Sequence, residues 1–293
     1  MDYLIGDRIK DLREHLNISQ KALSKDICTQ GQISKIESNT TIPTAPLLNQ
    51  IANRLGVDIN YFFDDLSRNG IHYVQEAKLN IDKLIRNQNY HEVMYAVRLE
   101  KKNPLFRKPH LQQYLLWREG ICIFHLYHDS VKAISLLDYA LSLGDSSKKN
   151  PSETELDILG SKAVILSKIN QFEEADHIYK SIYTKIEALP KFTNQRLLIR
   201  VLFNASRNAY DRKNYKDSLS YANKAIQICI EEEQLYLLGH LLFQKSCSLF
   251  QEDASNKDYC LELLSDALWV NKLHPNRAFA TSLEEEIHYI KTS

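Results

Sequence analysis

The stretch "QGQISKIES", residues 30–38, places hydrogen-bonding side chains around two isoleucines spaced three apart. In a helix these isoleucines fall on one apolar face, which leaves the polar side chains on another. Glutamine can pair with adenine through two hydrogen bonds, serine can bond to several bases, and lysine contacts guanine or phosphate. The pattern therefore predicts a helix that contacts DNA. The candidate contacts are Gln30, Gln32, Ser34 and Lys35, together with Asn39 just after the helix.

The elements that must position these side chains are short helices. Apolar residues recur at helical spacing through the first 65 residues, with capping residues between them. Ser19 is suited to cap a helix over 20–27, and Thr29 with Gln32 fits a capping box for the next helix. Only one or two residues would join the two, which is typical of a helix-turn-helix whose second helix enters the major groove. We expect five short helices here.

Two of the candidate contacts also have an ordinary structural interpretation. Gln32 could be only the returning arm of the capping box, and Lys35 only a solvated lysine on the helix surface. The sequence alone leaves both alternatives open.

The bulk composition favours helices and excludes several functional classes. The chain has 293 residues, 44% of them hydrophobic, but only 8 Gly and 7 Pro, which argues against a turn-rich β fold. The formal net charge is +0, so any DNA binding must come from local placement of charge. No apolar run approaches the roughly 20 residues of a membrane span, and the N-terminus lacks a signal-peptide pattern. We expect a cytoplasmic protein without a membrane partner.

Other potentially reactive groups do not form a convincing site. The five cysteines are scattered and form no CxxC pair, as expected for reduced thiols. In the string Cys122, His125 and His128, the third residue drifts off the helix face of the first two, so a metal site is not expected. There is no Gly-rich phosphate loop, no HExxH and no GxSxG motif. We therefore expect neither an enzyme nor a cofactor.

Residues after about 90 repeat with a long helical period. Small residues begin a second helix at Ala133, Ala175, Ser218 and Cys260, at spacings of 42, 43 and 42, and a fainter copy surrounds Val93. Each is followed four and seven residues later by a packing residue. These are Leu137 and Ala140, Tyr179 and Ile182, Ala222 and Ala225, and Leu264 and Ala267. Such a period predicts stacked helical hairpins that bury a continuous core and form a concave groove.

The groove of such an array would be lined by the first helix of each hairpin. In "RLLIRVLFNASRNAY", Arg200, Asn204 and Arg207 lie within two turns. Asparagine can bond both N–H and C=O groups of an extended peptide, and arginine can bind a carboxylate through two hydrogen bonds. Gln244 could act like Asn204 in the following repeat. The alternative is that these groups face solvent or bridge neighbouring helices.

The N-terminal segment "SQKALSKDICTQGQISKIESNTTIPTAPLLNQIANRLGV" resembles the helix-turn-helix of phage-repressor-like (Xre/Cro) regulators, most specifically in "SQ" and "ISKIE". The resemblance implies that Gln20 contacts a backbone phosphate. It also implies a structural ion pair between Arg13 and Glu37, which would link the first and third helices.

The whole chain resembles the peptide-pheromone-responsive Rgg/Rap/NprR/PlcR/PrgX (RNPP) regulators of Gram-positive bacteria, and most of all their PlcR-like members. The similarity is strongest in "IKDLREHLNISQKALSKDICTQGQISKIES" and continues in "LQQYLLW", "KIEAL" and "YANKAIQI". It implies an all-α fold: a helix-turn-helix domain over 1–65, a linker helix and the start of the first repeat over 66–89, and a TPR-like peptide-binding and dimerisation domain over 90–293. That domain would be a right-handed superhelix of about five hairpins with a C-terminal capping helix near 276–290.

The resemblance also implies how such a protein works. A homodimer would bind double-stranded DNA with a two-fold-symmetric operator, and a short imported signalling peptide in the concave groove would control it as a quorum-sensing-type activator. Arg86, Asn204, Gln244 and Phe279 match peptide-contacting positions of the family. Two positions depart from it, because Gly160 stands in place of a groove asparagine and Gln88 in place of a basic residue. The ligand could therefore differ from that of PlcR-like members.

Two other functions remain open at the level of sequence. One is a constitutive repressor that uses its repeats only to dimerise. The other is a Rap-like protein-interaction module whose repeats bind another protein.

Overall fold

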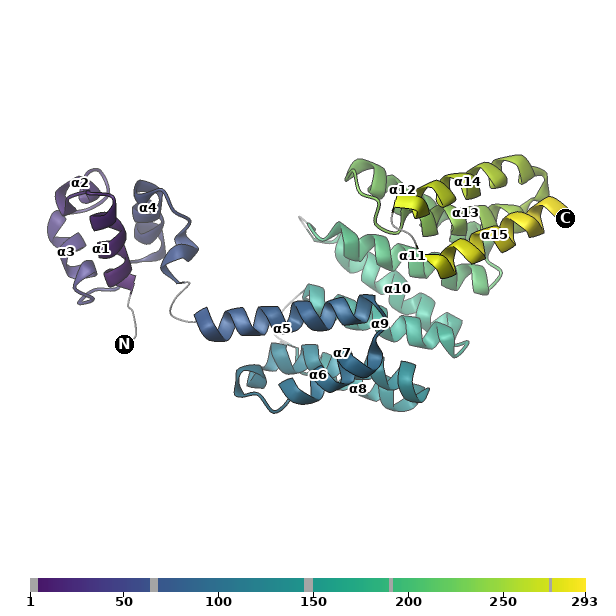
Figure 1. The fold of residues 1–293 in the computed structure, drawn as a ribbon, viewed down its shortest axis with the longest axis horizontal. Coiled ribbons are helices and arrows are strands. Elements are labelled where there is room, and N and C mark those ends of the chain that lie inside the picture. The colour runs from purple at the N-terminus through teal and green to yellow at the C-terminus, as the bar shows by residue number, and fades with distance from the viewer. Residues whose placement is uncertain (1–4, 64–67, 145–149, 190–191, 274–275) are drawn as a thin grey trace. The chain divides into compact units, whose positions relative to one another are not determined.

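The computed structural model describes residues 5–63, 68–144, 150–189, 192–273 and 276–293, and every regular element in these ranges is a helix (Figure 1). The all-α prediction is therefore confirmed. The chain divides into two compact units, Met1–Asn87 and Gln88–Ser293.

The first unit contains the expected five short helices and then a longer one. They are α1 (Ile5–His15), α2 (Gln20–Ser24), α3 (Gln30–Glu37), α4 (Ala45–Leu55), the 3-10 helix η1 (Ile59–Phe62) and α5 (Arg68–Arg86). The short helices surround a small core in which Ile9, Leu23, Ile33, Ile51 and Phe62 are fully buried. These apolar residues come from five different elements, so the core forms only when all five pack together.

The second helix is shorter than the sequence predicts. It ends at Ser24 rather than at residue 27, because Lys25 leaves the helical conformation with a ψ of 127° and Asp26 follows with a φ of 60°. The connection to α3 is therefore residues 25–29, longer than the one or two residues expected. Thr29 caps α3 as predicted, since its hydroxyl accepts a hydrogen bond from the Gln32 backbone N–H at 3.2 Å. The capping box is only half formed, because among the described residues the Gln32 side chain makes no return hydrogen bond to Thr29.

The predicted connecting segment 66–89 is only partly described. Residues 66 and 67 lie outside the described residues, and from Arg68 the segment is helix α5. The helix ends at Arg86, and Gln88 then adopts a φ of 58°.

The second unit is a row of helical hairpins (Figure 1). Its helices are α6 (Tyr90–Glu100), η2 (Pro104–Arg107), α7 (Pro109–Tyr127), α8 (Ser130–Ser142), α9 (Glu153–Lys168), α10 (Phe172–Glu187), α11 (Gln195–Asp211), α12 (Tyr215–Glu231), α13 (Leu238–Glu252), η3 (Ala254–Asn256), α14 (Lys257–Leu273) and α15 (Arg277–Thr292). Helices α7 and α8, α9 and α10, α11 and α12, and α13 and α14 form four successive hairpins. Helix α6 packs on α7, and α15 covers the other end against α13 and α14.

The period read from the sequence marks the buried positions of these hairpins. Ala133, Ala175, Ser218 and Cys260 are all fully buried near the start of α8, α10, α12 and α14. The eight packing residues predicted four and seven positions later are at most 2% exposed. Small side chains at the first position let each second helix approach its neighbours closely. The repeat prediction is therefore confirmed at the level of individual side chains.

The first helices of neighbouring hairpins also contact one another, α7 with α9, α9 with α11, and α11 with α13. Polar contacts between them join residues one repeat apart, such as Trp117 with Ser161 and Asp157 with Arg200, 44 and 43 residues apart. The layer of first helices is thus joined through equivalent positions of successive repeats.

The repeat core is expected to respond to loss of a single methyl group. Ile182 is 0% exposed in the core that α9, α10 and α11 share. We expect Ile182→Val to lower the free energy of unfolding by about 1 kcal/mol. Val131→Ala, at a side chain 80% exposed on α8, should change it by less than about 0.5 kcal/mol. Thermal unfolding of both variants checks this, and equal shifts would contradict the assigned core.

Candidate functional site

The exposed face of α3 carries four of the predicted DNA contacts. Ile33 and Ile36 point into the core, at 0% and 1% exposure. Gln30, Gln32, Ser34 and Lys35 are all exposed on the remaining surface of the helix. The sequence pattern of residues 30–38 thus separates a buried apolar face of the helix from an exposed polar face.

A chain of side-chain hydrogen bonds holds Gln30 at the start of α3. The Gln30 Nε2 group donates to Gln20 Oε1 at 2.7 Å, and the Gln20 Nε2 group donates to Glu37 Oε2 at 2.8 Å. The predicted base contact and the predicted phosphate contact are therefore joined to each other before any DNA arrives. Such preorganisation reduces the entropy lost when these side chains bind a partner.

The network ends on a buried ion pair between Arg13 and Glu37. Arg13 Nε lies 2.6 Å from Glu37 Oε1, and Arg13 Nη2 lies 2.8 Å from Glu37 Oε2, so the pair is bidentate. The two side chains are only 10% and 2% exposed. Hydrogen bonding to Glu37 and its negative charge raise the pKa of Arg13. The ion pair joins α1 to α3 and anchors the glutamines above it.

Asn39 is used within the fold and is not brought into this network. Its Oδ1 accepts a hydrogen bond from the Gly6 backbone N–H at 2.9 Å, and its Nδ2 donates to Asp7 Oδ1 at 2.9 Å. A Cβ on Gly6 would lie 1.9 Å from the carbonyl oxygen of Ile36, so only glycine permits this contact between α1 and α3. Asn39 therefore has a structural role, and its DNA contact stays a prediction.

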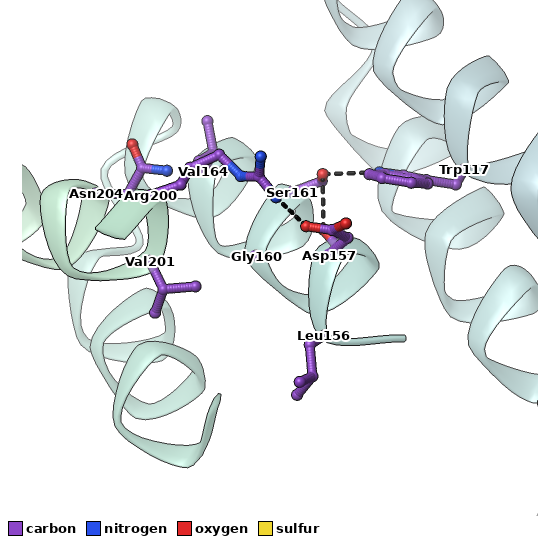
Figure 2. A pocket seen from close by; sticks show the side chains of 9 residues that line it. All are labelled: Trp117, Leu156, Asp157, Gly160, Ser161, Val164, Arg200, Val201 and Asn204. Carbon is purple, nitrogen blue, oxygen red and sulfur yellow. Dashed lines mark hydrogen bonds and ion pairs between the residues drawn. The ribbon is translucent and has the colours of Figure 1, made fainter. Parts of the chain in front are cut away.

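A pocket opens in the second unit between the first helices α7, α9 and α11 (Figure 2). It has about 370 Å³ of empty space, part of it open to solvent. Arg200 and Asn204 project into it from α11, one turn apart, and face Asp157 and Gly160 of α9. Two of the predicted peptide contacts therefore share one pocket between the first helices of neighbouring hairpins.

The polar wall of the pocket is held in place by contacts between repeats. Arg200 forms an ion pair with Asp157. Trp117 Nε1 donates to Ser161 Oγ at 2.8 Å, and that hydroxyl donates to the Asp157 carbonyl oxygen at 2.9 Å. Burial raises the pKa of Asp157, and the charge of Arg200 only partly opposes this. Burial lowers the pKa of Arg200, but the charges of Asp157 and Tyr236 and the hydrogen bonds to both together raise it further, so the net shift is upward.

Asn204 and Gly160 leave the rest of the pocket available to a ligand. The Asn204 carboxamide is partly exposed and has no hydrogen bond to any residue in the described part of the chain. It can therefore bond the N–H and C=O groups of an extended peptide. A Cβ built on Gly160 would meet nothing within 4 Å.

The other predicted peptide contacts lie elsewhere. Arg86 is exposed at the end of α5, in the first unit. The guanidinium of Arg207 lies 5.7 Å from the ring centre of Phe203 and outside the pocket lining. Gln244 is 6% exposed and its Nε2 bonds to Ser248 Oγ at 3.4 Å. Phe279 is 9% exposed and stacks on His240, with 3.8 Å between ring centres. Their peptide contacts stay predictions.

Sequence reasoning missed Trp117, Asp157 and Ser161 as parts of this pocket. A usable signal was present, because the pairs that build it are separated by one repeat period. The same separation recurs for Glu153 and Asn194, 41 residues apart, which also form a hydrogen bond. Polar pairs at the repeat period therefore mark contacts between neighbouring hairpins.

Groups that could hold a metal ion are not found among the described residues, where no three His, Cys, Asp or Glu side chains come together suitably. Within the same ranges, none of the helices combines the length and apolar character needed to cross a bilayer.

Comparison with known protein families gives two matches along the chain. The RNPP family C-terminal domain matches residues 78–291, and a helix-turn-helix domain matches residues 6–65. No curated protein sequence matches the chain significantly.

Solved structures of similar fold cover nearly the whole chain. PlcR of Bacillus thuringiensis, in complex with the peptide PapR7 and DNA, has a TM-score of 0.80 at 24% identity, covering 95% of this chain and 98% of PlcR. ComR of S. thermophilus, with DNA and its signalling peptide ComS, has a TM-score of 0.65 at 17% identity, covering 98% and 99%. The Streptococcus dysgalactiae pheromone receptor Rgg2 has a TM-score of 0.62 at 14% identity, covering 97% and 99%. At these identities the likeness establishes the shared fold.

Proposed function

Because this chain belongs to the RNPP family, whose C-terminal domain spans residues 78–291, we propose that it is a transcription regulator controlled by a signalling peptide. The observation that carries the proposal is the presence in one chain of a helix-turn-helix whose α3 exposes a polar face and of an open pocket in the repeats. Such a protein acts on DNA in the cytoplasm, as a regulator rather than an enzyme.

The DNA-binding half of the proposal rests on α3 and its supporting network. Gln30, Ser34 and Lys35 lie on one exposed helix surface, and Gln20 joins Gln30 to the buried ion pair. A helix-turn-helix of this kind inserts its second helix into the major groove. A homodimer would place two such helices on the half-sites of a two-fold-symmetric operator.

The peptide-binding half rests on the pocket between α7, α9 and α11. Asn204 supplies a free carboxamide, and Arg200 supplies a cation that is 42% exposed. The related PlcR and ComR structures contain a peptide and DNA together. A peptide can change operator affinity only if it binds the two arrangements of the dimer with different affinities.

Operator titration with and without peptide tests the proposal. Duplexes that bind the full-length protein are first selected from a random pool. The best duplex is then titrated in the presence and absence of the small-peptide fraction of the producing culture. We expect this fraction to shift operator affinity by about 5- to 150-fold. Tight binding that is indifferent to the fraction would support a constitutive repressor, and no DNA binding would direct attention to protein partners.

The selected operator also tests the role assigned to Gln30. We expect Gln30→Ala to lower the preference for the best duplex over one with a changed adenine by about tenfold. The loss should be specific, because binding to unrelated DNA rests on phosphate contacts. Gln112→Ala in the second unit is the control. Equal preference in the variant and the wild type would remove Gln30 from the base-reading set.

A further inference from the structure

We propose that Gly160 opens a subsite for a carboxylate group of the peptide ligand, which Arg200 binds. The inference rests on the proposed function, since it names the chemical group of the peptide that this pocket would bind. It also gives a physical consequence to the departure of Gly160 from the family pattern.

The fold itself gives no steric reason for glycine at position 160. Two other helical glycines, Gly6 and Gly120, have one, whereas Gly31 of α3 also has open space where a Cβ would be. A Cβ on Gly120 would lie 3.0 Å from Leu137 Cδ2, and one on Gly6 would meet a backbone oxygen. Gly160 lies within α9, where glycine is less favourable than alanine, yet its Cβ would be free of contacts. The space above it therefore belongs to the pocket and is open to a ligand side chain.

The lining of this space combines apolar side chains with two side chains that can form hydrogen bonds. Leu156 and Val201 are buried at 1% and 4% exposure and line the pocket together with Val164. Arg200 and Asn204 stand beside them from α11 (Figure 2). A side chain with a short aliphatic stem and a polar tip fits such a lining.

The charged residues near the pocket favour a ligand side chain with a negatively charged end. A guanidinium has five N–H donors, so Arg200 keeps donors beyond those that reach Asp157 and Tyr236. A second guanidinium, that of Arg118, lies 3.5 Å from the centre of the Trp117 ring. Burial raises the pKa of Asp157, and the positive charges of both arginines lower it, which places two cations near this carboxylate. A cationic ligand group would instead compete with Arg200 for Asp157. A carboxylate is therefore the better partner.

The carboxylate could come from an Asp or Glu side chain or from the C-terminus of the peptide. Two random heptapeptide pools distinguish these sources, one with free and one with amidated C-termini. Full-length protein captures peptides from each pool, and mass spectrometry identifies them. Enrichment of Asp or Glu at one position in both pools indicates a side chain, whereas capture from the free pool alone indicates the C-terminus. Captured peptides without a shared carboxylate would overturn the inference.

Variants of the pocket then test the residues. With the best captured peptide, Gly160→Val should weaken binding by about tenfold or more, because its side chain fills the subsite. Gly160→Ala should weaken it less and raise the unfolding midpoint by about 2 °C. Asp157→Asn should tighten binding severalfold, since it frees donors of Arg200. Arg200→Met should remove the preference for a carboxylate, and Arg200→Lys should retain part of it.

The outcomes separate the inference from the proposed function. If peptides are captured but Gly160→Val and Arg200→Met bind them as the wild type does, the subsite is wrong and peptide control stands. If the wild-type protein captures nothing from either pool, both fail. An unfolding midpoint of Gly160→Val at or above that of the wild type shows that weakened binding does not reflect misfolding.

Discussion

Glu37→Ala is expected to destabilise the helix-turn-helix unit by about 3–5 kcal/mol and to abolish operator binding. The carboxylate is 2% exposed and accepts two hydrogen bonds from Arg13 and one from Gln20. Its removal leaves the buried guanidinium of Arg13 without its main partner. It also frees Gln20, and through it Gln30, to adopt other rotamers. Thermal unfolding of the full-length chain and fluorescence anisotropy with the selected operator measure the two effects.

Glu14→Ala provides a matched control for this prediction. Glu14 also contacts Arg13, at 3.2 Å, but its side chain is 54% exposed. An exposed ion pair contributes little, so this variant should lose less than about 1 kcal/mol and bind the operator normally. If Glu37→Ala has the same unfolding midpoint as Glu14→Ala and still binds the operator, the buried ion pair does not support the recognition helix.

Asn204→Ala is expected to weaken peptide binding by about 100-fold. The loss of two hydrogen bonds to a peptide backbone, at about 1.5 kcal/mol each, corresponds to roughly this factor. Because the Asn204 carboxamide has no hydrogen bond within the described chain, its removal should not destabilise the repeats. Isothermal titration with a captured peptide gives the affinity, and the operator titration shows whether the peptide still shifts DNA binding.

Asn223→Ala is the control for Asn204→Ala. Asn223 is exposed on α12, the second helix of the same hairpin, and lies outside the pocket lining. Its replacement should leave peptide affinity unchanged. Equal affinities for Asn204→Ala and the wild type would mean that the peptide does not use this pocket, whatever its effect on DNA binding.

The sequence alone predicted the buried positions at which the second helices of the repeats pack. The pattern from Ala133 to Cys260 predicted second helices, and each of these positions is fully buried. It also separated Ile33 and Ile36 from the exposed side chains of α3. Such inferences succeed because helical periodicity and repeat length are local properties of the chain, and burial of the apolar face follows from them.

Only the tertiary structure decided which polar side chains meet. In the folded chain Asn39 forms hydrogen bonds to Gly6 and Asp7 at the start of α1. Gln244 is buried in the interior, and Gln20 is hydrogen-bonded to Gln30. The tertiary structure also assembled the pocket from three helices, with partners one repeat apart. A local pattern predicts the face of a helix on which a side chain lies. Its partner depends on how closely the neighbouring helix packs, which is decided by contacts distant in the sequence.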